Sequence, residues 1–159
     1  MASNCSNFDP VVVIGGGFAG LTTVLALSQS LQRPPIILIE PSPRFVFFPF
    51  LYELLSEELS LWQVAPSYKS VLKGRGVLLI QDYVERIDVK AKKVLTALGQ
   101  SFNYSYVVLA TGSVPNYLGV PGIRENAFTF HSLEDVDRLK KTINELKDCQ
   151  EEKKSLVVI

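Results

Sequence analysis

The sequence predicts an α/β fold built on a buried parallel sheet, and three stretches carry that prediction. Residues 11–14, 36–39 and 106–110 read VVVI, IILI and YVVLA, which are continuous apolar runs of strand length. Such runs are typical of parallel strands that are buried on both faces. A glycine-rich turn and an apolar helical stretch separate the first two runs, which is the order of a βαβ unit.

The expected elements follow one another in a definite order. The first helix starts near Phe18 and ends near Arg33, because Pro34 and Pro35 cannot continue it. The later expectations are a helix with Pro49 in its first turn over 49–59, a short helix opening at 66 and ending at 73–74, a buried strand over 77–80, an antiparallel meander over 82–106, a proline-rich loop over 113–122, and an amphipathic helix opened by a capping box at 132–135.

Composition excludes several classes of function. Lysine plus arginine equals aspartate plus glutamate, 16 each, so there is no basic excess of the kind that nucleic-acid binders show. Cys5 and Cys149 form no CxxC, which argues against a zinc ribbon and a redox-active dithiol. The single histidine, His131, rules out a histidine-rich metal site and is expected at the entrance to a helix.

The lack of a leader segment and of a membrane-spanning run favours one compartment. The first ten residues, MASNCSNFDP, contain no basic, apolar or Arg-rich leader segment. The longest apolar runs have strand length, well below the roughly 18–20 residues that span a bilayer. The sequence therefore predicts a cytoplasmic protein without a signal peptide or a transmembrane helix.

The candidate ligand-binding residues lie in the first βαβ unit. Its turn reads Gly15-x-Gly17-x-x-Gly20, and Glu40 ends its second strand. Gly15 permits the tight turn, Gly17 lets a pyrophosphate approach the backbone, and Gly20 lets the helix pack close to the strand. The helix-start amides point at the phosphates, and Glu40 can accept both ribose hydroxyls while repelling a 2′-phosphate. The alternative for the glycine-rich turn is a plain strand-to-helix connection, and the alternative for Glu40 is a solvated strand end. This motif predicts a dinucleotide but does not distinguish FAD from NAD.

Two separated motifs carry a family resemblance. GGGFAG, a meander, and then YVVLATGSVPN with VPG are similar to the FAD-binding part of the two-dinucleotide-fold flavoprotein reductases. The disulfide reductases of that family carry a CxxxxC that is absent here, because no cysteine lies between Cys5 and Cys149. The segment RFVFFPFLYELLSEELSLWQVAP, with its P-x-L-Y-E, resembles the type II NAD(P)H dehydrogenases. It looks closest to their cyanobacterial and plastid branch, which includes the demethylphylloquinone reductases.

The resemblance implies a role for each position that matches the family. Gly15, Gly17, Phe18, Ala19 and Gly20 would hold the FAD pyrophosphate, Glu40 the adenosine ribose, Val84 the adenine through its backbone, Ala110, Thr111 and Gly112 the flavin side of the site, and Arg44, Pro49 and Leu51 the isoalloxazine end. For the last group the alternative is a hydrophobic loop packed under a second domain. Phenylalanines 45, 47, 48 and 50 are more often core residues than cofactor contacts.

The resemblance also implies an activity and a domain plan. Residues 1–9 would be an N-terminal tail, 10–150 an incomplete FAD-binding domain of Rossmann type, and 151–159 a linker with the first strand of a missing NAD(P)H-binding domain. A complete enzyme would pass a hydride from NAD(P)H to FAD and two electrons to a membrane quinone, plastoquinone-like or naphthoquinone-like. No side chain is assigned as catalytic, and the fragment alone is expected to be inactive.

Partners and alternatives complete these expectations. The family pattern implies peripheral contact with the cytoplasmic face of a plasma or thylakoid membrane and a possible homodimer. A reductase of the same fold that passes electrons to a ferredoxin-like or rubredoxin-like protein is one alternative. A non-catalytic nucleotide-binding fragment and a one-domain NAD dehydrogenase are the others.

Overall fold

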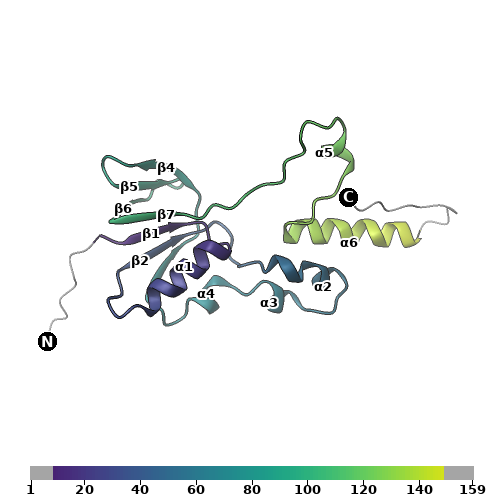
Figure 1. Cartoon of the computed structure of the whole chain (residues 1–159). Helices are drawn as coiled ribbons and strands as arrows, with labels where there is room; N and C mark the ends of the chain where they lie inside the picture. The colour runs from purple at the N-terminus through teal and green to yellow at the C-terminus, as the bar shows by residue number, and fades with distance from the viewer. Residues whose placement is uncertain (1–8, 149–159) are drawn as a thin grey trace. The chain divides into compact units, whose positions relative to one another are not determined.

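The computed structural model describes residues 9–148, which divide into two compact units (Figure 1). The first unit comprises residues 9–45 and 66–114, and the second comprises 46–65 and 115–148. Residues 1–8 of the tail expected over 1–9, and the strand expected near 155–159, lie outside the described residues.

A parallel sheet of four strands forms the centre of the first unit, in the order β3-β2-β1-β7. Its strands are β1 (Val11–Ile14), β2 (Ile36–Ile39), β3 (Val77–Ile80) and β7 (Tyr106–Leu109). Val11 lies opposite Ile36 on one side and Tyr106 on the other. The three apolar runs that predicted the α/β fold are therefore neighbours in one sheet, and that prediction is confirmed.

The expectation of burial holds for the central strands but is wrong for the outer ones. Every residue of β1 and β2 is buried, whereas β3 and β7 expose Leu78, Tyr106 and Leu109 by 52%, 72% and 66%. The reason is position in the sheet, because β3 and β7 are its two edges among the described strands. A central strand and an edge strand can have similar apolar composition, so the local sequence does not distinguish them.

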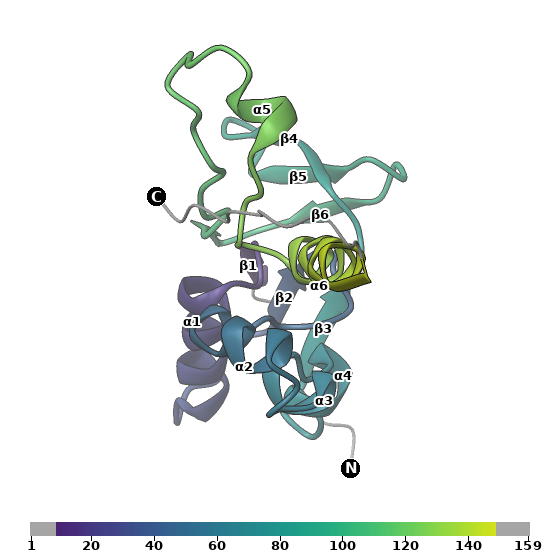
Figure 2. The ribbon, with the colours of Figure 1, turned by 90° about the vertical axis from the view of Figure 1, so that its right-hand side faces the viewer.

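The two faces of this sheet carry different layers. On one face Val12, Ile14, Ile37 and Ile39 pack against Val94 of the meander and its flanking residues. The meander consists of β4 (Val84–Asp88), β5 (Lys93–Thr96) and β6 (Ser101–Asn103), antiparallel as predicted. Helix α1 (Phe18–Gln29) covers the opposite face, as the two views in Figures 1 and 2 show. Each strand contributes to both layers, because successive side chains of a strand point to opposite faces of the sheet.

Several helix boundaries differ from the prediction. The helix expected over 49–59 is a 3₁₀ turn over Phe48–Phe50 followed by α2 (Leu51–Leu55), and the helix expected to end at 73–74 ends at Val71. Helix α1 ends at Gln29, and Ser30 is already extended at φ −62° and ψ 143°. The helix stops four residues before Arg33, which precedes Pro34, so the proline pair does not set this boundary. Helix α4 (Tyr68–Val71) begins after Ser67, whose hydroxyl accepts the Ser70 N–H at 3.2 Å, rather than at the preceding proline.

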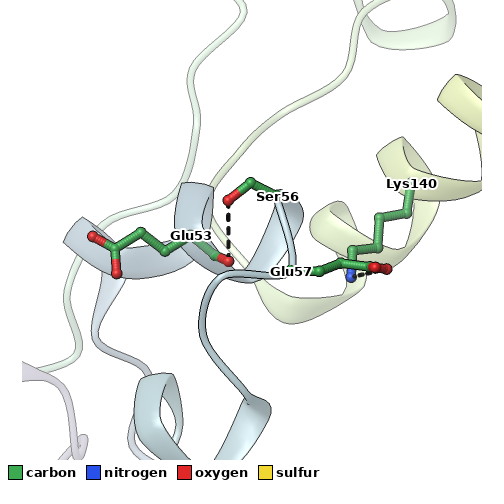
Figure 3. A network of polar contacts seen from close by, with 4 residues as sticks. All are labelled: Glu53, Ser56, Glu57 and Lys140. Atoms are coloured by element: carbon green, nitrogen blue, oxygen red, sulfur yellow. Dashed lines mark hydrogen bonds and ion pairs between the residues drawn. The ribbon is translucent and has the colours of Figure 1, made fainter.

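The second unit is helical. It contains a 3₁₀ turn over Phe48–Phe50, α2 (Leu51–Leu55), α3 (Leu61–Val64), α5 (Ile123–Asn126) and α6 (Leu133–Asp148). Leu51, Val64 and Val136 form its buried core, with Leu59 packed against them from beyond the end of α2. Figure 3 shows the Glu57–Lys140 ion pair, 3.2 Å, that joins the end of α2 to α6. Such an exposed pair contributes about 0–1 kcal/mol, so the apolar core holds this unit together.

The predicted capping box at the start of α6 is confirmed, with one change. The Ser132 hydroxyl accepts the Asp135 N–H at 3.0 Å, but the Asp135 carboxylate reaches back to the N–H of His131 at 2.9 Å, one residue earlier than in the usual motif. The Thr129 hydroxyl donates to the same carboxylate at 2.8 Å. His131 thus stands at the helix entrance as predicted, and its ring stacks on Phe48 with centroids 4.6 Å apart.

Candidate dinucleotide-binding site

The glycine-rich turn joins β1 to α1, and close packing demands two of its glycines. Gly15 has φ +94°, a conformation that L side chains rarely adopt, and a Cβ there would overlap the carbonyl oxygen of Ala110. A Cβ on Gly20 would overlap the carbonyl oxygen of Gly15 and lie 3.3 Å from the Ala110 side chain. These positions therefore need glycine for the fold itself.

Gly17 is different, because the described structure gives no internal reason for a glycine there. Its φ is −61°, which any residue can adopt, and a Cβ built on it meets nothing within 4 Å. The residue is exposed and forms the N-cap of α1. A position that is open in the protein alone but lacks a side chain fits a site where a ligand approaches the backbone.

The first turn of α1 is prepared for an anion. The first N–H groups of an α-helix have no partner within the helix, and the helix dipole adds positive charge there. In α1 neither a side-chain cap nor an acidic residue neutralises this end. The exposed Phe18 and Ala19 open the helix, and the Phe18 ring packs edge-on against Phe45 at 5.2 Å. A pyrophosphate has the charge that this helix end favours.

Glu40 lies at the carboxyl end of β2, as predicted, and its carboxylate is held by backbone. Its Oε2 accepts the Gly16 N–H at 2.6 Å, and its Oε1 accepts the Ser42 N–H at 2.9 Å. The side chain is half-buried. Each carboxylate oxygen keeps a second acceptor site, so the group can still accept ribose hydroxyls. These bonds tie the acid to the glycine-rich turn, which disfavours the alternative of a solvated strand end.

The segment 110–112 meets the same turn from the neighbouring strand. The Ala110 N–H donates to the Ile14 carbonyl at 2.8 Å, which extends the pairing of β7 with β1. Ala110 therefore lies against Gly15 and Gly20, while Thr111 and Gly112 continue into exposed chain. The structure brings together two motifs that lie about ninety residues apart in the sequence.

The other predicted residues of the first unit lie in its loops and meander. Arg44 is half-buried, forms an isolated antiparallel bridge with Ser67, and exchanges two hydrogen bonds with Ser42. Val84 opens β4 opposite Thr96, and its side chain packs on the core beneath the sheet. Their roles toward the flavin and the adenine stay predictions.

Pro49 and Leu51 belong to the second unit, whereas the glycine-rich turn belongs to the first. Pro49 is exposed in the 3₁₀ turn, whereas the Leu51 side chain is 1% exposed and forms part of the core. Leu51 is thus first a packing residue, and a role for either residue near the isoalloxazine stays a prediction. Phe45 is a core residue as expected, but Phe48 and Phe50 are 38% and 40% exposed.

Sequence reasoning missed one member of this site. The hydroxyl of Tyr68, from α4, donates to the Gly16 carbonyl at 2.7 Å, and the side chain is 2% exposed. A Cβ on Gly16 would overlap this phenol, which explains the middle glycine of the turn. Tyr68 is 52 residues from Gly16 in sequence, and no local pattern connects them. Among the described residues, no group of three or more His, Cys, Asp or Glu could hold a metal ion.

Residues 9–159 match the profile of the family described as pyridine nucleotide-disulphide oxidoreductase. The chain belongs to that family. The match spans nearly the whole chain, and the α/β fold with a parallel and an antiparallel sheet agrees with it. The family resemblance inferred from GGGFAG and YVVLATG is therefore confirmed.

Three curated relatives are similar to this chain in sequence. Demethylphylloquinone reductase NdbB of Synechocystis is 33% identical over 94% of this chain. The alternative NAD(P)H-ubiquinone oxidoreductase C1 of Arabidopsis thaliana is 35% identical over 86%, and the type II NADH:quinone oxidoreductase of Staphylococcus aureus is 31% identical over 85%. The chain spans only 39%, 30% and 34% of their respective lengths. These names agree with the type II resemblance drawn from RFVFFPFLYELLSEELSLWQVAP.

Solved structures give the same fold. The sulfide:quinone oxidoreductase of Aquifex aeolicus aligns with a TM-score of 0.80 and 29% identity, over 87% of this chain and 32% of its own. NDH2 of Plasmodium falciparum aligns with a TM-score of 0.77 at 21% identity, over 94% of this chain and 31% of its own, which supports the fold alone. The part of this chain that the structure describes contains no helix long and apolar enough to cross a membrane.

Proposed function

We propose that this chain is the FAD-binding part of an NAD(P)H:quinone oxidoreductase. The observation that carries the proposal is the open face at Gly17, where an uncapped helix start, Glu40 and the 110–112 segment converge on one glycine-rich turn. The names of the curated relatives supply the reaction class, since all three denote reductases or oxidoreductases of quinones. The chain covers about a third of their lengths, so the activity belongs to a complete protein of that kind.

The residues present fit FAD, and each has a defined task. The N–H groups at the start of α1 bind the pyrophosphate, and Gly17 leaves room for it. Glu40 accepts the ribose hydroxyls while its backbone partners hold it in place. By the family resemblance, Val84 would contact the adenine, residues 110–112 would line the flavin side, and Arg44, Pro49 and Leu51 would be assigned to the isoalloxazine end. When bound, FAD would supply the redox chemistry, which is acceptance of a hydride from NAD(P)H and transfer of two electrons to the acceptor.

Protein side chains do not perform the redox chemistry in this proposal. No cysteine lies between Cys5 and Cys149, so the chain offers no dithiol near the flavin site for disulfide exchange. The chain's contribution is binding, orientation and electrostatics. A plastoquinone-like or naphthoquinone-like acceptor, peripheral attachment to the cytoplasmic face of a plasma or thylakoid membrane, and a homodimer belong to the same proposal and rest on the family resemblance.

The test is an absorption spectrum of the purified 159-residue chain and of the longest product of its gene, before and after heat release of the cofactor. The longer product should show flavin bands that bleach with NAD(P)H and return with a quinone, and the released compound should be FAD. Recovery with a ferredoxin-like protein but not with a quinone would favour the protein-reductase alternative. A colourless longer product that still binds NAD would overturn the assignment of FAD.

A further inference from the structure

Glu40 and Tyr68, which come from two different parts of the chain, bind the backbone N–H and the backbone carbonyl of Gly16. The Gly16 N–H donates to Glu40 Oε2 at 2.6 Å, and the Gly16 carbonyl accepts the Tyr68 hydroxyl at 2.7 Å. Glu40 follows β2, and Tyr68 begins α4. The turn is thus held at Gly16, one residue before the open position at Gly17.

Holding the Gly16 carbonyl also sets the direction of the next amide. A trans peptide is planar, so the carbonyl of one residue and the N–H of the next point in opposite directions. No cis peptide occurs in the described chain. Because the Gly16 carbonyl points inward to the buried phenol, the Gly17 N–H points away from it. Among the described residues no hydrogen-bond acceptor for the Gly17 N–H is found, and the space beside Gly17 is open.

We propose that Tyr68 is a positioning residue of the dinucleotide site, whose hydroxyl holds the Gly16 peptide so that the Gly17 N–H faces the pyrophosphate. This inference rests on the proposed function, because it assigns an unpartnered backbone donor to that ligand. Without the phenol, the Gly16–Gly17 peptide would be free to rotate, since glycine has few conformational restrictions. The helix start would remain, but one donor would no longer be oriented in advance.

The chemical state of Tyr68 suits this role. Burial, and secondarily the negative charge of Glu40, raises the pKa of Tyr68 above its ordinary value. The phenol therefore keeps its proton throughout the neutral range and remains a donor. The tyrosine ring also fills the space over Gly16, so replacement of the hydroxyl alone separates hydrogen bonding from packing.

The experiment compares Tyr68→Phe with Tyr104→Phe in the 159-residue chain, by titration with ADP and with adenosine. Tyr104 is a matched control, because it is a buried tyrosine of the same unit that packs beneath the sheet. Tyr68→Phe should weaken ADP binding roughly 3- to 10-fold, the range expected for one hydrogen bond, and leave adenosine binding unchanged. Tyr104→Phe should change neither affinity. A purely structural role for Tyr68 would lower both affinities together, and that result would overturn the proposal.

A second measurement does not depend on the variant folding. In the wild-type chain, the amide resonance of Gly17 should move downfield with ADP and stay in place with adenosine. A Gly17 amide that does not respond to ADP, or equal ADP affinity in wild type and Tyr68→Phe, would overturn the role of Tyr68 and leave the proposed function standing. A wild-type chain that binds no ADP, together with a longer product that lacks flavin, would overturn both.

Discussion

Two glycines of the same motif should fail in different ways when each is changed to alanine. Gly20 is enclosed, because an added Cβ would overlap the Gly15 carbonyl oxygen and approach the Ala110 side chain to 3.3 Å. Gly17 is open, because an added Cβ meets nothing within 4 Å and its φ of −61° is allowed for alanine. We therefore expect Gly20→Ala to lower stability and Gly17→Ala to lower ligand affinity.

The magnitudes follow from the atoms that the new methyl group meets. Alanine is about 1 kcal/mol better than glycine within a helix, but overpacking costs about 1–3 kcal/mol and more when the obstacle is backbone. Gly20→Ala should therefore lose about 1–2 kcal/mol of unfolding free energy. Gly17→Ala should lose less than about 1 kcal/mol, because it changes only an N-cap. The same methyl placed against a bound pyrophosphate should weaken ADP binding about tenfold or more.

Urea denaturation followed by circular dichroism gives the stability of both variants, and calorimetric titration with ADP gives their affinity. Wild type and each variant are compared under identical salt conditions, because phosphate binding is electrostatic. The reasoning is refuted if Gly20→Ala unfolds at the wild-type urea concentration, or if Gly17→Ala binds ADP as tightly as wild type.

Three further predictions concern other parts of the two units. Glu40→Gln should weaken adenosine binding several-fold and pyrophosphate binding less, because it replaces one ribose-accepting oxygen by an amide while the other oxygen can still accept the Gly16 N–H; an equal or larger loss for pyrophosphate in parallel titrations would contradict this. For Asp135, burial acts to raise the pKa, but hydrogen bonds from the His131 N–H and the Thr129 hydroxyl prevail and lower it. Its folded pKa is depressed, so its stabilising effect is complete above the ordinary pKa near 3.9 and is lost as the pH falls through the folded value; Asp135→Asn should flatten acid unfolding in that window, and an unchanged acid transition would count against the assignment. Leu51→Ala should destabilise the second unit by about 2–5 kcal/mol, read from the fluorescence of Trp62, the single tryptophan, and a loss below about 1 kcal/mol would argue against Leu51 as a core residue.

The sequence alone was sufficient for the parts of this protein that local pattern determines. Continuous apolar runs indicated the strands of the parallel sheet, and alternation with turn residues indicated the meander, because the position of a strand follows from local side-chain type. The spacing of Gly15, Gly17, Gly20 and Glu40 correctly placed the glycines on one strand-to-helix turn and the acid at the end of the next strand, and their role toward a dinucleotide stays a proposal. The capping box at Ser132 was equally local.

Tertiary structure decided what depends on neighbours that are distant in the chain. Only the strand order made β3 and β7 edges and exposed residues that look like core residues in sequence. Only packing placed Leu51 in a core and showed that Gly20 is required by contact while Gly17 is not. The bond from Tyr68 to Gly16 spans 52 residues, and no periodicity or motif can encode a contact that exists only after α4 has folded against the turn. Local sequence patterns determine the backbone conformation of each helix and strand and which of its faces is hydrophobic. The contacts between individual residues are determined by how those faces pack against one another in the tertiary structure.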